Sequence, residues 1–344
     1  MSAPDSSPAR NKPPEKLFTF QSGGWVLLIA GILTLASAAL VLYPVYTTGF
    51  HRSIGDGRDP NTYGFDLSNL AIPRDKLVAS GYAKDEIHAV PEKLVETDVP
   101  EAIEQMARNE HIRFLIPSDL VIGISLNGIT RAYPTRLLNI HEVVNDRFGD
   151  TPVVVSWSPL CGSAMVFDRR IDGKEVEFGV SGLLYQSNLI LFDRRADPKQ
   201  ESLWPQLALH AISGPAAGKR PTLIAHRVMP WSDWFAQHPD TRVWLGLRTL
   251  KMQYGDAQDP INMYLRSDDL KFGVDPYWND PKVPRKTRIE VTTTDFHRFT
   301  AQLPESATTA PATPSTNPAP FRISTFIFAW YAQHAEDTDY SALK

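Results

Sequence analysis

The stretch VIGISLNGITRAY, residues 121–133, decides how this chain folds. Apolar residues lie on both sides of Asn127-Gly128, and Asn-Gly is favoured in a two-residue type I′ turn because both positions need positive φ. We therefore predict a β-hairpin that pairs residues 121–126 with residues 129–133. An antiparallel sheet is expected around it.

The residues that follow the hairpin predict one helix and four strands. Residues 134–146 begin with proline and place Leu137, His141 and Val144 on one helical face, so His141 should point inward. Asp172-Gly173 reads as a turn among the later strands. The β-rich runs are residues 153–157, 164–167, 175–180 and 189–192. We predict an α+β fold with a central, mainly antiparallel sheet, short flanking helices such as residues 100–109, and one preceding transmembrane helix.

Two sequence echoes suggest repeated structure. Residues 167–170 and 192–195 both read Phe-Asp-Arg-Arg at the end of a predicted strand, which favours similar ion pairs there. Residues 234–241 (WFAQHPDT) resemble residues 330–338 (WYAQHAEDT). We predict that these aromatic segments form helices with equivalent packing.

The amino-terminal part contains an uncharged apolar run, residues 25–46. At about 1.5 Å per residue it can cross a hydrocarbon core of about 30 Å, so we predict an uncleaved membrane helix. Ala36-Ser37-Ala38 also has the spacing of a cleavage site, and a cleaved signal peptide is the alternative. Basic residues exceed acidic ones before the run, which favours a cytoplasmic amino terminus at a bacterial inner membrane and a periplasmic main domain.

Composition bounds the rest of the organisation. A net charge of −4 with both signs interspersed predicts no nucleic-acid binding, while residues 25–46 predict contact with the membrane. A membrane-protein partner is a separate expectation of the accessory-subunit hypothesis. A single cysteine excludes an intramolecular disulfide framework. The expected segments are a polar tail at 1–24, the anchor, a linker at 47–65, the main domain at 66–304, an Ala/Thr/Pro-rich linker at 305–320 and a docking segment at 321–344.

Several motifs together resemble one known family. Arg131-Ala132-Tyr133-Pro134, then HEVVND at 141–146, then SPLC at 158–161 are similar to the bacterial domain-of-unknown-function family 3179. The resemblance covers roughly residues 66–290 and includes 178–182, 193–194, 201–204, 214–215 and 218–219. It implies a shared fold and site geometry and supplies no substrate. Ser158 stands where the family has the first cysteine of a pair, so two-thiol chemistry is not available here.

Two groups of residues are candidates for chemistry and binding. Cys161 lies in a tight turn and is either a buried small hydrophobe or a thiolate whose pKa His141 lowers. His141 is either a core histidine or a base, with Glu142 or Asp146 to orient its ring. A zinc-protease motif is excluded because residue 145 is asparagine. By resemblance to the family, the residues expected to line a cleft are Ser181, Asp193, Ser202 and Trp204. The alternatives are core packing for Trp204 and a turn cap or arginine pair for Asp193.

A metal site is an alternative that uses some of the same residues. Thiolate, imidazole and the thioether of Met165 would suit copper, and zinc is a further option for Cys161 and His141. His210 and His226 are available as a second imidazole but have no diagnostic spacing. The sequence itself requires no cofactor.

Two hypotheses for function follow. The first is a membrane-anchored, periplasm-facing binding or accessory subunit of a membrane-associated assembly, favoured because Ser158 breaks the cysteine pair. The alternative is a thiol- and histidine-based enzyme or a copper-type metal-binding protein that uses Cys161 and His141.

Overall fold

The computed structural model describes residues 25–26, 28–37, 54–110, 115–246, 260–304 and 320–343. The chain divides into two units, Met1–Arg52 and Ser53–Lys344. In the first, residues 25–26 and 28–37 are helical and exposed. The hydroxyls of Thr34 and Ser37 donate to the carbonyls one turn earlier, at 2.8 and 2.7 Å.

The predicted membrane helix, residues 25–46, lies only partly within the described residues. Within those residues, the structure contains no helix that is both long enough and apolar enough to cross a membrane.

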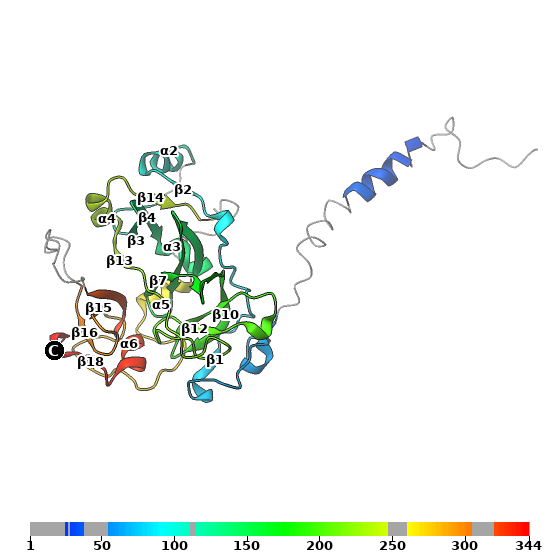
Figure 1. Cartoon of the computed structure of the whole chain (residues 1–344). Coiled ribbons are helices and arrows are strands. Elements are labelled where there is room, and N and C mark those ends of the chain that lie inside the picture. The colour runs from blue at the N-terminus through cyan, green and yellow to red at the C-terminus, as the bar shows by residue number, and fades with distance from the viewer. Residues whose placement is uncertain are drawn as a thin grey trace, which may run out of the picture. The chain divides into compact units, whose positions relative to one another are not determined.

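The second unit is rich in β-strands and has few helices, which places it in the α+β class (Figure 1). One central sheet was expected, but the described strands form several sheets, with 4, 5, 4, 3 and 2 strands. Most strand pairs are antiparallel, and the two parallel pairs are β4 with β14 and β16 with β18. The described helices of this unit are α2 (Pro100–Glu110), α3 (Thr135–His141), α4 (Trp231–Gln237), α5 (Pro260–Arg266) and α6 (Ile327–His334), apart from short 3₁₀ turns.

The predicted hairpin is confirmed. Strands β3 (Leu120–Leu126) and β4 (Ile129–Pro134) pair antiparallel, with Leu126 opposite Ile129. Asn127 has φ 53° and Gly128 has φ 73°, as a type I′ turn requires.

Two further sheets form the part of this unit that we call the body. Strands β5 (Val143–Phe148), β6 (Thr151–Ser158) and β7 (Ser163–Asp168) form one of them. Strands β1 (Leu77–Ala79), β10 (Phe178–Tyr185), β11 (Asn188–Asp193) and β12 (Leu203–Pro205) form the other. Between the two sheets, Asp172-Gly173 makes the predicted turn of a short hairpin, β8 (Arg170–Ile171) and β9 (Lys174–Glu175).

The helix predicted over residues 134–146 is wrong in its second half. Helix α3 ends at His141, Glu142 takes a left-handed φ of 55°, and residues 143–148 continue as β5. Val143 and Val144 are β-branched, and every residue of β5 pairs with β6. Sheet pairing therefore overrode the helical spacing of the apolar residues.

Two regions of the chain share one topology. Each begins with a hairpin of two strands. The third strand pairs antiparallel with the first strand of the hairpin, and after a helix the fourth strand pairs parallel with the second strand of the hairpin. We call them module 1 and module 2. Module 1 consists of β3, β4, β13 (Arg227–Pro230), α4 and β14 (Arg242–Trp244), and β2 (Thr97–Asp98) extends its sheet. Module 2 consists of β15 (Arg288–Thr293), β16 (Phe299–Gln302), β17 (Phe321–Phe326), α6 and β18 (Thr338–Asp339).

The sequence echo at 234–241 and 330–338 marks this repeat, and its equivalent packing is confirmed. Trp234 Nε1 donates to Thr241 Oγ1 at 3.0 Å, and Trp330 Nε1 donates to Thr338 Oγ1 at 2.9 Å. In both helices the tryptophan ring packs on the histidine one turn later, with ring centroids 4.0 Å apart. The other echo also holds, because Asp168 pairs with Arg170 and Asp193 with Arg195.

Residues 54–65 of the expected linker and the expected docking segment belong to the same compact unit as the main domain. Within residues 54–65, Tyr63 is fully buried. The expected docking segment at 321–344 supplies β17, α6 and β18 of module 2. Figure 1 shows β15, β16, α6 and β18 together at one end of this unit. Module 2 attaches to the body where the Phe326 amide and the Thr325 hydroxyl donate to the Cys161 carbonyl, at 2.8 and 3.2 Å.

Candidate functional site

The candidate site forms where α3 ends. The Glu142 amide donates to the Leu138 carbonyl at 2.7 Å, and the Trp157 amide donates to the Glu142 carbonyl at 2.7 Å. These two bonds hold Glu142 at positive φ, a conformation that costs an ordinary residue about 1 to 2 kcal/mol. Strain of this kind gathers at functional sites, and here it turns the chain sharply from helix to sheet.

His141 is buried at the inner end of this turn. Its Nδ1 lies 3.0 Å from the His88 carbonyl, and its ring meets the edge of Trp244 with centroids 6.0 Å apart. Burial lowers the pKa of His141, which the His88 carbonyl partly opposes. The imidazole is therefore neutral at pH 7.

Glu142 has the opposite shift. Burial raises the pKa of its carboxyl to about 8, and the positive charge of Lys271 opposes that rise. At pH 7 the side chain is mainly protonated and can donate a hydrogen bond. A neutral imidazole and a neutral carboxyl thus stand side by side on the chain.

Both residues line a cavity of about 430 Å³. Such a volume is typical of small-molecule sites, which are mostly apolar with a few polar groups. The walls are largely apolar, and the polar side chains come from Ser80, Tyr82, Glu86, His88, Asn139, His141, Glu142 and Lys271. Pro159 and Leu160 form part of the wall, and Cys161 follows them in the chain without lining it.

Cys161 is fully buried behind this wall. Its sulfur donates to the Ser187 carbonyl at 3.2 Å. Burial raises the pKa of the thiol to about 12, although hydrogen bonds from Asn188 and Ser158 oppose the rise. The sulfur is therefore a protonated hydrogen-bond donor at neutral pH.

Asp146, the remaining catalytic candidate, lies in a buried network on β5 rather than in the cavity wall. Its Oδ1 accepts from Arg131 Nη1 at 2.5 Å and its Oδ2 accepts from the Tyr133 hydroxyl. The side chain of neighbouring Asn145 accepts from the Phe178 amide at 2.7 Å and donates to the Phe178 carbonyl at 2.9 Å. These motif residues tie β4, β5 and β10 together.

The four cleft candidates bond or pack in the interior and do not line the His141–Glu142 cavity. Asp193 Oδ1 accepts from the Ser202 amide at 2.6 Å and from Trp204 Nε1 at 3.2 Å. Ser181 Oγ donates to the Ile190 carbonyl at 2.6 Å, and Ser202 Oγ accepts from the Ala216 amide at 2.9 Å.

The candidate metal ligands are dispersed. Cys161 and Met165 share one hydrophobic cluster, whereas His141 lies against Trp244. His226 is buried with its ring nitrogens near the carbonyls of Ile224 and Ala164, and His210 Nδ1 is near the Ala208 carbonyl. Among the residues that the structure describes, no three His, Cys, Asp or Glu side chains gather into a metal-sized group.

A protein family described as "Protein of unknown function (DUF3179)" matches residues 96–315. The chain belongs to this family. The matched range contains His141, Glu142 and Cys161, whereas four polar residues of the cavity wall, Ser80, Tyr82, Glu86 and His88, precede it. No curated protein and no solved structure matches the chain.

The structure shows what the DUF3179 motifs do in this chain. The Arg131–Tyr133–Asp146 network and Asn145 hold strands together, whereas His141 and Glu142 face a cavity. The Cys161 amide donates to the Ser158 carbonyl at 3.2 Å, so the residue at the position where the other cysteine of the pair was expected is in contact with Cys161.

Several cavity residues were not expected from the sequence. Ser80, Tyr82 and His88 come from the segment before α2, and Lys271 comes from the segment after α5. None lies in a local motif that could mark it. Only the folded chain brings them beside Glu142.

Proposed function

We propose that this DUF3179 protein is a membrane-anchored, periplasm-facing binding subunit that takes up a small molecule in the His141–Glu142 cavity. The observation that carries the proposal is that Glu142, whose carboxyl has its pKa raised to about 8 by burial, lines a mostly apolar cavity of about 430 Å³. A half-buried carboxyl that is mainly protonated at pH 7 is a donor matched to a ligand acceptor.

The ligand class follows from the wall. Neutral Glu142 and the Lys271 ammonium both offer hydrogens, while the remaining surface is largely apolar. A small neutral molecule with a carbonyl acceptor fits these groups. Binding is favoured over thiolate chemistry because the Cys161 thiol is protonated, buried and already bonded to a carbonyl.

The membrane part of the proposal rests on residues 25–46. The run carries no charged side chain, and the hydroxyls of Thr34 and Ser37 are satisfied by backbone carbonyls, as hydrocarbon surroundings demand. The excess of basic residues before it supports a cytoplasmic amino terminus.

The cavity is tested with three neutral carbonyl probes, cyclohexanone, caprolactam and valerolactone, by saturation-transfer NMR on the full chain. At least one should bind at pH 7 and weaken as pH rises through about 8, where Glu142 ionises. Glu142→Gln should bind without that pH dependence, and Glu142→Ala should lose binding. Glu86→Gln, a change on the same wall, is the matched control. Equal binding to Glu142→Ala and the parent would refute the assignment.

The anchor is tested by carbonate extraction of membranes and by the mass of the purified chain. Full-length chain should remain in the pellet with residues 1–46 intact. Leu33→Arg should release it, because an arginine at the centre of a membrane helix costs about 2.5 to 3.5 kcal/mol, whereas Leu33→Met should not. A chain that begins after Ala38 would establish the cleaved signal peptide instead.

A further inference from the structure

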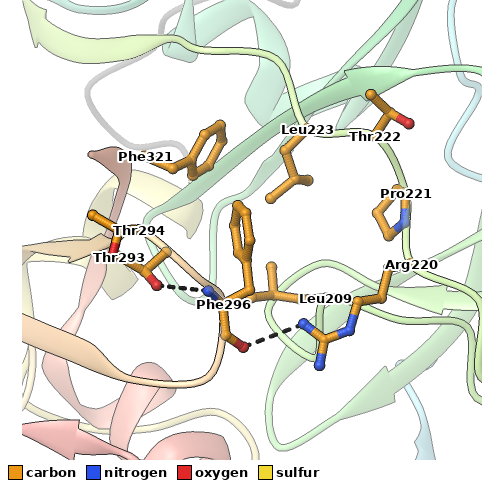
Figure 2. A pocket seen from close by; sticks show the side chains of 9 residues that line it. All are labelled: Leu209, Arg220, Pro221, Thr222, Leu223, Thr293, Thr294, Phe296 and Phe321. Carbon is orange, nitrogen blue, oxygen red and sulfur yellow. Dashed lines mark hydrogen bonds between the residues drawn. The ribbon is translucent and has the colours of Figure 1, made fainter. Parts of the chain in front are cut away.

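A second binding region lies between the body and module 2. An apolar cavity of about 420 Å³ is formed by Leu209, Arg220, Pro221, Thr222, Leu223, Thr293, Thr294, Phe296 and Phe321 (Figure 2). A more polar cavity of about 330 Å³ also has Leu209, Arg220 and Phe296 in its wall, and adds His210, Gln333, His334 and Asp337. Leu209, Arg220 and Phe296 line both cavities, so the two are adjacent, and we call them together the Arg220 groove. It shares no lining residue with the His141–Glu142 cavity.

Two of the three shared residues have strained backbones. Leu209 has φ 59° and Phe296 has φ 58°, values that are unusual for large side chains. Phe296 is held there by its amide, which donates to Thr293 Oγ1 at 2.9 Å, and by its carbonyl, which accepts from Arg220 Nη1 at 3.2 Å. Figure 2 shows the Phe296 ring directed between Phe321 and Leu223. The strain therefore places an aromatic ring in the groove.

Gln333 gives an independent indication of a ligand. Both its Nε2 and its Oε1 are buried, and neither has a hydrogen-bond partner among the described residues. Gln237, at the matching position of module 1, donates from Nε2 to the Asp233 carbonyl at 3.1 Å. An unsatisfied buried amide is unfavourable, and Gln333 is in the wall of the polar cavity.

Arg220 gives the groove a cation that can pair with an anion. His334 and Asp337 pair with each other at 3.0 Å, and His334 Nε2 lies 2.8 Å from the Leu207 carbonyl, so both are engaged. Arg220 forms no ion pair with the described carboxylates, and its one recorded hydrogen bond is to the Phe296 carbonyl. A planar guanidinium matches a carboxylate in geometry and charge.

We propose that the Arg220 groove binds a free carboxylate with a medium-length hydrocarbon tail. The carboxylate accepts from Arg220 and from the Gln333 amide. The tail lies against Leu209, Leu223 and Phe296 in the apolar cavity. This site is separate from the small-molecule cavity at Glu142 and does not depend on it.

The probe is terminally trifluorinated decanoate, observed by ¹⁹F NMR with the full chain in phosphatidylcholine nanodiscs. Partition into the bilayer is the same for every variant, so differences between variants report the groove. Decanoate should give a bound signal, while the matching decanol, which lacks the charge, and trifluoroacetate, which lacks the tail, should each bind at least about 10-fold more weakly.

Matched variants assign the signal to the groove. Arg220→Ala should weaken decanoate binding about 10-fold or more, whereas Lys219→Ala removes a neighbouring charge that pairs with Asp172 and should leave it unchanged. Gln333→Ala should weaken binding, and Gln237→Ala should not. Thr294→Trp, at an exposed wall position, should block the tail.

Three results would overturn the proposal. Equal binding of decanol and decanoate would show that the charge is not recognised. Equal weakening by Lys219→Ala and Arg220→Ala would show only a general charge effect. Displacement of decanoate by phosphatidylglycerol in the nanodiscs would identify a lipid headgroup as the ligand in place of a free carboxylate.

Discussion

Modules 1 and 2 have the same strand order and the same Trp–His–Thr packing, yet they serve the molecule differently. In module 1, residues 135–226 are inserted between β4 and β13, and this insertion contains β5, β6, β7, β10 and β11. Module 2 has no such body and instead lies against the Cys161 turn. The difference shows that the tryptophan, histidine and threonine stabilise each module. The cavities are formed by the segments inserted into a module or packed against it.

The surroundings of the two helices differ as well. Trp330 belongs to a large cluster that includes Cys161 and Met165 from the body. Trp234 belongs to a smaller cluster that module 1 forms with Ile103 of α2 and Leu115. Its ring packs so closely on Gly123 that a Cβ there would lie 2.3 Å from the ring. We therefore expect damage in module 2 to spread and damage in module 1 to stay local.

The largest expected effect comes from Trp330→Ala. Removing a fully buried tryptophan should cost about 3 to 5 kcal/mol in free energy of unfolding, and should also loosen the Cys161 turn. Trp234→Ala should lose a similar packing energy but leave Cys161 protected. Urea unfolding with thiol-labelling rates measures both. Rapid labelling of Cys161 in both variants would contradict a local role for module 1.

The next effect concerns Glu142, which follows α3 at the start of the segment inserted into module 1. The pKa of its carboxyl is about 8 in the folded protein and 4.5 ordinarily, so the folded state holds its proton over a wider pH range. Stability from this group is complete below pH 4.5 and is lost as pH rises toward 8. At pH 9 Glu142→Gln should therefore unfold with about 2 to 3 kcal/mol more free energy than the parent.

The comparison for Glu142 is the slope of stability with pH, measured by urea unfolding from pH 5 to pH 9. Glu86→Gln, on the same cavity wall, should keep the slope of the parent. A parent whose stability does not change over this range would show that Glu142 titrates normally.

A smaller and equal effect is expected at the two threonines. Thr241→Val and Thr338→Val each remove the acceptor of a tryptophan Nε1–H with little change in volume. Each should cost about 1 to 2 kcal/mol, because a buried donor is left without a partner. Thermal and urea unfolding measure both losses. Unequal losses would mean that the tryptophan–threonine hydrogen bond stabilises the two modules to different extents.

Local sequence features predicted the parts of the fold that local chemistry determines. Asn127-Gly128 determined the hairpin because its turn needs positive φ at both residues. The two Trp-to-Thr echoes predicted equivalent packing because each bond spans only 7 or 8 residues. The end of α3 was predicted wrongly, since the positive φ of Glu142 depends on its bond to Trp157 and on the pairing of β5 with β6.

The site was less accessible to sequence reasoning for the same reason. His141 and Glu142 were candidates because a family motif contains them, but the raised pKa of Glu142 comes from burial by distant segments. Tyr82 precedes residues 135–226 in the sequence and Lys271 follows them, yet both line the cavity. No sequence pattern marks either residue. Chemistry that depends on such long-range assembly cannot be predicted from local spacing.

The smallest expected effect has opposite signs in the two modules. Gln333→Met removes an amide whose two polar atoms are buried without partners, so it should stabilise the chain by about 1 kcal/mol. Gln237→Met breaks the bond to the Asp233 carbonyl at an exposed position and should cost about 0.5 kcal/mol or less. Urea unfolding of both variants gives the two signs directly. A loss of stability in Gln333→Met would mean that the amide is satisfied in solution, and the two glutamines would then be equivalent after all.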